Sequence, residues 1–209
     1  MSYSLNEMEA TAKRATRGAG YSWGLAEEAS KAARWLCAQG LDGSAYLVRV
    51  LESDLAINPP LHRPKTVEGV WKGENNLCPL AVGSLLSDCA KHLQHTPIEM
   101  HNIAVPSMLL PFVAQAARAL GSTICVTCDG LLAETNGTAL HQNQAFADTA
   151  TSVIVARSTT VLKPTVHVTR AFPTKESWNS LNQFAHRTYA PATEESRKLG
   201  AGAGLSDND

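Results

Sequence analysis

Between residues 97 and 129 the sequence changes from an extended pattern to a helical one and back again. Residues 98–105 alternate in part and contain neither glycine nor proline, which predicts a strand. From Met108 to Leu120 apolar residues recur at helical spacing, and β-branched residues then predict a second strand over residues 122–128. The simplest arrangement is a right-handed β-α-β crossover with parallel pairing, although the pattern also allows antiparallel strands.

The first 56 residues predict a layer of helices. Ser4-Leu5-Asn6-Glu7 has the spacing of a capping box, so a helix should start at Leu5. Ser22 can cap a second helix that ends at Gly40, and a third is expected from Ala45 to Leu55. The many alanines on the apolar stripes of the first two helices predict that these helices pack closely side by side.

The remaining sequence predicts an irregular connection, a sheet and a last helix. Prolines and glycines interrupt residues 57–76, but Trp71 in that connection should dock on the folded part. A fourth helix should open at Pro79, and Asn136-Gly137 marks a hairpin. The other expected elements are strands over residues 151–156 and 165–170, a helix over residues 176–187 and a Gly/Ala-rich tail over residues 189–209.

Together these elements predict one domain over residues 1–209 of the α/β (mixed α+β) class. We expect an N-terminal helical layer (residues 1–56), the irregular connection (residues 57–76) and an α/β sheet region (residues 77–188). The sheet should be mixed, with a β-α-β unit and a C-terminal helix. The tail would complete the chain.

Composition excludes some classes of partner. The 18 basic and 19 acidic residues nearly balance and form no long run of one sign, so we expect no binding to nucleic acid or to an anionic membrane. No apolar run is long enough to span a bilayer, and residues 1–17 lack the apolar segment of a signal peptide. Five cysteines in such a chain are typical of reduced thiols, which predicts a soluble cytoplasmic protein.

One group of candidate site residues lies on the polar faces of the predicted strands. Strand periodicity places Glu99 beside His101 and Cys125 on the same face as Asp129, while His167 lies on a polar face of the strand over residues 165–170. If these faces align, they could form a cavity with groups for proton transfer. We favour the alternative, a sheet face that is solvated or packed on a dimer partner.

Two cysteine motifs have the residue types of metal or redox sites but not their context. Cys125 and Cys128 form a C-x-x-C inside a predicted strand, whereas a redox pair needs a helix N-terminus and a zinc site needs a second pair of ligands. The series Cys89, His92 and His95 extends over a predicted helix end, where its third member rotates away from the first. We therefore expect no metal and no cofactor.

A second group of candidates could bind an anion. Arg14, Arg17 and Arg34 could bind a carboxylate or phosphate, and the glycines between Arg17 and Trp23 let a ligand, or two helices, approach the backbone closely. Glu27 and Glu28 follow on the second helix. If the tail folds back, it could add the carboxylates of Asp207 and Asp209. The plainer interpretation is that these helix charges are exposed and pair with one another, including Arg14 and Arg34 with Glu27 and Glu28.

Two segments carry a resemblance to a known family. They are RATRGAGYSWGLAEEASKAARWL (residues 14–36) and RTYAPATEESRKLGAGAGLSDND (residues 187–209). Both are similar to a bacterial family known only as a domain of unknown function, and the resemblance extends over nearly the whole chain. It implies no activity, but it implies that the segments 17–28 and 189–209 are hallmarks of the family. The helical start, with Leu41-Asp42-Gly43, also loosely resembles the malate/L-lactate dehydrogenases that lack a Rossmann fold, without their cofactor and histidine motifs.

These observations lead to two hypotheses. In the first, the protein is a homodimer that binds a small polar or anionic metabolite through Arg17, Trp23, Glu27 and Glu28, with Asp207 and Asp209 of the tail. In the second, it is a non-catalytic accessory or structural subunit that uses its sheet face and tail for contacts between copies. The sequence does not decide whether the protein is an enzyme.

Overall fold

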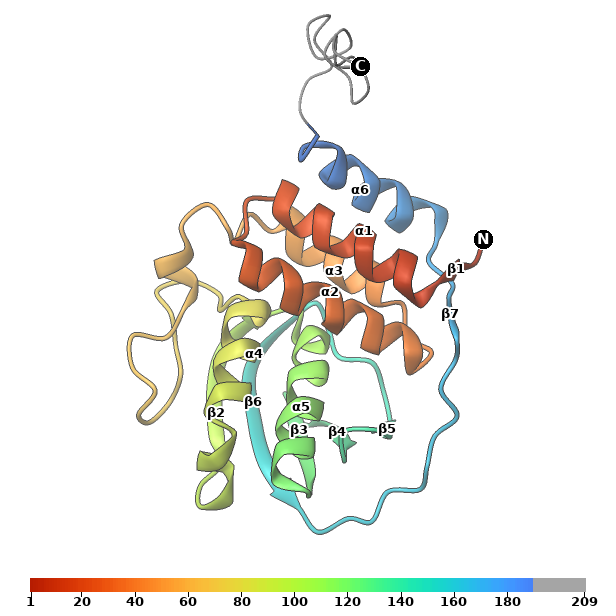
Figure 1. Cartoon of the computed structure of the whole chain (residues 1–209). Helices are drawn as coiled ribbons and strands as arrows, with labels where there is room; N and C mark the ends of the chain where they lie inside the picture. The colour runs from red at the N-terminus through yellow and green to blue at the C-terminus, as the bar shows by residue number, and fades with distance from the viewer. Residues whose placement is uncertain (190–209) are drawn as a thin grey trace, which may run out of the picture.

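The computed structural model describes residues 1–189 and arranges them as a layer of helices above a five-stranded sheet (Figure 1). The helical layer contains α1 (Leu5–Gly18), α2 (Trp23–Ala38), α3 (Gly43–Glu52) and the C-terminal helix α6 (Lys175–His186). This arrangement confirms the mixed α+β class, with an N-terminal helical layer and a helix after the sheet. Buried residues of the layer and of the sheet belong to one hydrophobic core.

Local hydrogen bonds set the starts of the first two helices where the sequence predicts them. The Ser4 hydroxyl accepts a hydrogen bond from the Glu7 amide (3.1 Å), and the Glu7 carboxylate accepts one from the Ser4 amide (2.8 Å). The capping box is therefore complete and α1 begins at Leu5. Ser22 caps α2 in the same way, by accepting from the amide of Leu25 at 3.3 Å.

Small side chains allow α1 and α2 to approach each other closely. Ala12 and Ala15 of α1 and Ala29 of α2 are fully buried. An alanine side chain adds little width to a helix, so two such stripes can face each other with their backbones near. The expected close packing of these helices is confirmed.

The sheet has the strand order β2-β6-β3-β4-β5, and each of these neighbouring pairs is antiparallel. Its strands are β2 (Ile98–Ala104), β3 (Thr123–Cys128), β4 (Leu131–Thr135), β5 (Leu140–Gln142) and β6 (Thr149–Ser158). The two hairpin strands β4 and β5 flank Asn136-Gly137, as predicted.

The β-α-β unit is present, but its two strands do not pair with each other. Both β2 and β3 are antiparallel to β6, which lies between them, so they run in the same direction without sharing hydrogen bonds. Val155 of β6 has Ile98 on one side and Val126 on the other, and all three side chains are buried. The expected direct parallel pairing is wrong because a strand from later in the chain occupies the position between the two.

Helices cover one face of this sheet. They are α4 (Pro79–Asp88), α5 (Leu110–Leu120) and the short 3-10 helices η2 (Ala90–Gln94) and η3 (Pro106–Leu109) (Figure 1). Regular α-helix begins at Leu110, so Pro111 lies in the first turn, where proline is tolerated. Among residues 1–189, no helix combines the length and the apolarity that crossing a bilayer requires.

The irregular connection is anchored to the free edge of β2. It contains the 3-10 helix η1 (Pro59–His62) and then passes along β2, where the amide of Trp71 donates to the Glu99 carbonyl (2.8 Å) and the His101 amide donates to the Trp71 carbonyl (2.9 Å). The Trp71 side chain is 1 % exposed, and its indole nitrogen donates to the carbonyl of Val67. The expected docking of Trp71 is confirmed.

The strand predicted over residues 165–170 is wrong. Only β7 (Arg170–Ala171) forms there, and it pairs with β1 (Tyr3–Ser4) near the start of the chain. The preceding residues follow an extended path without a ladder, and Val166 is 93 % exposed. Alternating residues form a strand only when their backbone pairs with another strand, and within residues 1–189 this segment has no ladder partner before Arg170.

Two glycine substitutions test the packing of α4 on α5. A Cβ atom at Gly83 of α4 would overlap the ring of Phe112, whereas one at Gly24 of α2 would have no neighbour within 4 Å. We expect Gly83→Ala to lower the free energy of unfolding by about 1–3 kcal/mol, because the buried ring must move. Gly24→Ala should raise it by about 0.5 kcal/mol through helix propensity. Urea denaturation of both variants measures the difference, and equal effects would contradict the close contact.

Candidate functional site

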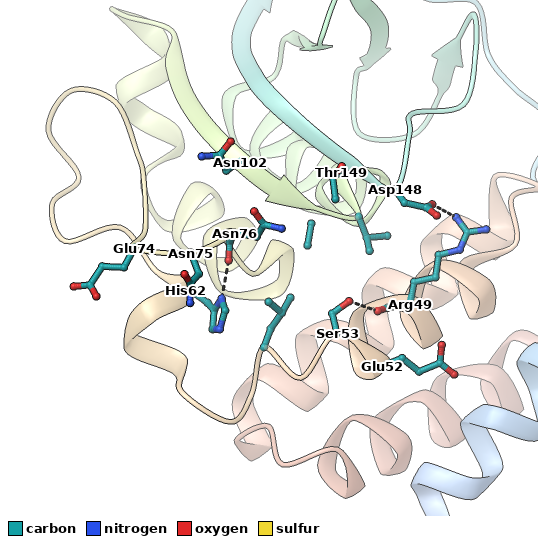
Figure 2. Close-up of a pocket in the computed structure, with 13 residues that line it drawn as sticks. Arg49, Glu52, Ser53, His62, Glu74, Asn75, Asn76, Asn102, Asp148 and Thr149 are labelled. Atoms are coloured by element: carbon teal, nitrogen blue, oxygen red, sulfur yellow. Dashed lines mark hydrogen bonds and ion pairs between the residues drawn. The ribbon is translucent and has the colours of Figure 1, made fainter.

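A large cavity lies where the helical layer, the connection and the end of β2 meet. Its volume is about 780 Å³, which is within the range of small-molecule sites. Figure 2 shows polar side chains around it from segments that are far apart in the sequence. The lining residues are Arg49, Glu52, Ser53, Leu55, His62, Glu74, Asn75, Asn76, Asn102, Ala104, Val105, Asp148 and Thr149.

The last turn of α3 forms the first wall. Arg49 forms an ion pair with Asp148, which precedes β6, and thereby links the helical layer to the sheet (Figure 2). The Ser53 hydroxyl donates to the Arg49 carbonyl at 2.6 Å and satisfies one of the free carbonyls at the helix end. About half of the Arg49 side chain remains exposed, so solvent or a ligand can reach its guanidinium group.

The connection forms the second wall and includes a histidine in a defined tautomer. Nδ1 of His62 lies 2.7 Å from the backbone carbonyl oxygen of Asn76 (Figure 2). A carbonyl oxygen can only accept, so Nδ1 is the donor of this hydrogen bond. Within residues 1–189 Nε2 has no hydrogen-bond partner, so a ligand in the cavity could bind to it.

The end of β2 forms the third wall and contains two unusual backbone conformations. Asn102 and Val105 have positive φ angles of 54° and 44°, in the left-handed region that side chains other than glycine rarely adopt. Backbone hydrogen bonds hold both residues: the Leu77 amide donates to the Asn102 carbonyl, and the Val105 amide donates to the Asp148 carbonyl, each at 2.7 Å.

The left-handed conformations of Asn102 and Val105 indicate backbone strain at the cavity wall. Asparagine adopts this region several times more often than most residues, but a β-branched valine before a proline is a clear outlier. Such strain costs of order 1–3 kcal/mol and is concentrated at binding and active sites in known proteins. The two conformations therefore support the choice of this cavity as the candidate site.

The lining favours hydrogen bonding over binding of a strong anion. The Arg49 guanidinium already faces Asp148, while Glu52 and Glu74 add two further carboxylates to the lining. Most of the other polar groups are uncharged amides and hydroxyls: Ser53, Asn75, Asn76, Asn102 and Thr149. No group of three or more potential metal ligands is found among the described residues, at this cavity or elsewhere.

The candidate anion-binding residues on the first two helices lie on the surface of the helical layer, outside this cavity. Arg17 donates to the carbonyl of Tyr21, and its guanidinium stacks on the exposed ring of Trp23 at 4.7 Å. Glu27 pairs with Lys13 and Lys31, and Glu28 pairs with Lys31. The structure thus brings Arg17 into contact with Trp23, and Lys31 links Glu27 to Glu28. Asp207 and Asp209 lie outside the described residues.

The candidate residues on the polar strand faces are divided between the open face of the sheet and the segment after β6. The Glu99 carboxylate lies 2.8 Å from Nε2 of His101, and Asp129 accepts from the amides of Thr151 and Ser152. Burial, and then the carboxylate of Glu134, raise the pKa of the Cys125 thiol.

His167 is the member of this group that lies apart. It contacts the carbonyl of Thr138, in the loop between β4 and β5, at 2.6 Å. None of Glu99, His101, Cys125, Asp129 and His167 lines the large cavity.

Sequence reasoning did not find the residues of this cavity because no local motif marks them. They come from α3, the connection, the end of β2 and the loop before β6, which meet only in the folded chain. The one available signal was Asn75-Asn76 in a long irregular connection, since such connections are often functional.

Comparison with known proteins identifies the N-terminal half. Residues 3–103, from β1 into β2, match the model of a family described as "Protein of unknown function (DUF3726)". This match confirms, over that range, the expected resemblance to a domain of unknown function. No curated protein and no solved structure matches the chain significantly, so the loose likeness to malate/L-lactate dehydrogenases is not supported.

Removal of the arginine at the cavity should have little effect on folding. Arg49 and Asp148 are 46 % and 69 % exposed, and ion pairs in such positions contribute between 0 and about 1 kcal/mol. We expect Arg49→Gln to change the free energy of unfolding by less than about 1 kcal/mol in urea denaturation. A larger loss would mean that the pair is a structural link between the layers and not an available binding group.

Proposed function

We propose that the protein binds a small polar metabolite in the cavity at the end of β2. The observation that carries this proposal is the convergence of polar side chains from four separate segments on one cavity whose wall contains two strained residues. Binding is the part of the earlier hypothesis that this geometry supports. The residues involved are those of the cavity and not those first singled out on α1 and α2.

The lining supports a neutral or zwitterionic ligand with several hydroxyl, amide or amino groups. The three side-chain amides from Asn75, Asn76 and Asn102 can each donate and accept, as a polyhydroxylated or amino-acid-like ligand requires. Arg49 could bind one carboxylate, while Glu52 could bind an ammonium group. A polyanion would face three carboxylates and is disfavoured.

A variant at the strained wall tests the proposal. Asn102→Gly keeps a residue suited to the left-handed conformation while it removes one amide from the lining. We expect the melting temperature to stay nearly unchanged and the affinity for a ligand to fall by about tenfold, the equivalent of one lost hydrogen bond. The ligand is first sought by thermal shift with amino acids, polyols, sugars and nucleosides, and its affinity is then measured by calorimetry.

Asp54→Gly is the matched control. Asp54 also has a positive φ angle (54°) and is exposed, but its side chain does not line the cavity. The Asp54→Gly variant should therefore bind the ligand with the affinity of the unaltered protein. Equal loss in both variants would mean that backbone freedom matters and the Asn102 amide does not. A ligand that binds the Asn102→Gly protein unchanged would contradict the assignment of this cavity.

A second candidate function is supported by the open face of the sheet. No helix of the described residues covers this face, and Ile154 and Leu132 on it are each 39 % exposed (Figure 1). Both lie opposite Thr127, so they form one row across β6, β3 and β4. Such a half-apolar face suits contact between two copies in a homodimer, as an accessory or structural subunit would require.

Substitution on that row separates the two candidates. If two copies meet there, Ile154→Lys should convert a dimer to a monomer, because it places a charge in the middle of the contact. Light scattering after size-exclusion chromatography gives the mass. Val166→Lys, at a 93 % exposed position on the segment after β6, is the control and should leave the mass unchanged. A dimer that survives Ile154→Lys, or a monomeric unaltered protein, would rule out this face.

A further inference from the structure

A second, more enclosed cavity lies on the other side of the segment that follows α3. It has a volume of about 260 Å³ and lies between the turn that joins α1 to α2, the 3-10 helix η1 and the start of α4. Leu55 lines this cavity and the larger one, so the two are neighbours without being the same site. The lining residues are Gly20, Tyr21, Ser22, Leu25, Leu55, Ala56, Pro59, Arg63, Cys78 and Ala81.

The walls of this second cavity are mostly apolar. Leu25, Leu55 and Pro59 supply hydrocarbon surface, and Ala56 and Ala81 are small enough to leave space between them. Such walls favour the hydrocarbon part of a ligand by about 25 cal/mol for each Å² removed from water. This lining differs in kind from the amides and charges of the larger cavity.

Two buried polar groups lie together at the inner end. Tyr21 and Cys78 are 4 % and 2 % exposed, and Oη of Tyr21 lies 3.6 Å from Sγ of Cys78. Sulfur is a weak hydrogen-bond partner, so the phenol retains capacity for a stronger one. Burial raises the pKa of both groups, so the phenol and the thiol are neutral near pH 7 and the phenol can donate.

A cationic side chain, that of Arg63, lies at the outer end of the second cavity. Arg63 is exposed, and within residues 1–189 it forms no ion pair and no hydrogen bond. Asp88 lines a shallower hollow on the far side of Arg63, but the two do not pair. A guanidinium group without a partner beside an apolar cavity can bind a carboxylate in bidentate geometry.

We propose that this cavity binds a short organic acid with an apolar body and a hydroxyl group at its far end. The carboxylate binds Arg63, the body fills the space beside Leu25 and Ala81, and the hydroxyl hydrogen-bonds to Tyr21. The volume corresponds to roughly nine waters at ~30 Å³ each, which suits an acid of about six carbons. This site is distinct from the polar cavity at the end of β2, and the inference does not rest on the proposed function.

Three probes of equal length test the chemistry. They are 6-hydroxyhexanoate, hexanoate and 1-hexanol, titrated into the full chain by ligand-observed NMR and calorimetry. We expect 6-hydroxyhexanoate to bind best, hexanoate several-fold more weakly because it lacks the distal hydroxyl, and 1-hexanol at least about tenfold more weakly. Equal binding of hexanoate and 1-hexanol would overturn the role of Arg63, and no binding of any probe would overturn the site.

Three variants test whether the probes bind in this cavity. Arg63→Gln should weaken both acids at least about tenfold and leave 1-hexanol unaffected, because only the acids carry the charge. Tyr21→Phe should make 6-hydroxyhexanoate and hexanoate bind equally. Ala81→Leu should block all three probes by filling the space, and leucine at this α4 position keeps a good helix former.

Arg49→Gln is the matched control in the larger cavity. It removes a half-exposed arginine from a different lining and should leave the affinity for 6-hydroxyhexanoate unchanged. Loss of binding in Arg49→Gln together with full binding in Ala81→Leu would move the acid to the other cavity and overturn this proposal. If no polar metabolite binds at the end of β2 while these probes bind here, the proposed function fails and this inference stands.

Discussion

The free edge of β2 is the constraint on which both cavities depend. An edge strand leaves a row of N–H and C=O groups without partners, and these groups need hydrogen bonds when they are buried. The connection supplies them at Trp71 and Leu77, whose backbones pair with β2 on either side of an irregular stretch. Anchored in this way, the same connection brings His62 to one cavity and Arg63 to the other.

The fold follows from the sequence where the determining contacts are local. The capping box at Ser4, the hairpin at Asn136-Gly137 and the proline that opens α4 each act within a few residues, and all three appear as expected. The position of β6 between β2 and β3 depends on pairing over long sequence distances, which no local pattern contains. The strand expected over residues 165–170 failed for the same reason, since local alternation does not determine whether a distant strand pairs with it.

The candidate site was less predictable than the fold. Reasoning from residue types favoured Arg17, Glu27 and Glu28, but the nearby groups Tyr21 and Lys31 engage these side chains on the helix surface. The turn between α1 and α2 does contribute to the smaller cavity through its buried Tyr21. Reasoning from charged residues did not select this tyrosine because its side chain is uncharged. Asn102 and Val105 became candidates only through their φ angles, which follow from tertiary hydrogen bonds and not from sequence.

Leu55 lines both cavities, which makes the segment after α3 a partition common to the two. A ligand that displaces this side chain toward one cavity takes space from the other, so simultaneous occupancy then carries an interaction free energy. Thermodynamic linkage requires that this free energy be the same whichever ligand binds first. A leucine of no chemical reactivity thus sets whether the two cavities act as independent sites or report on each other's occupancy.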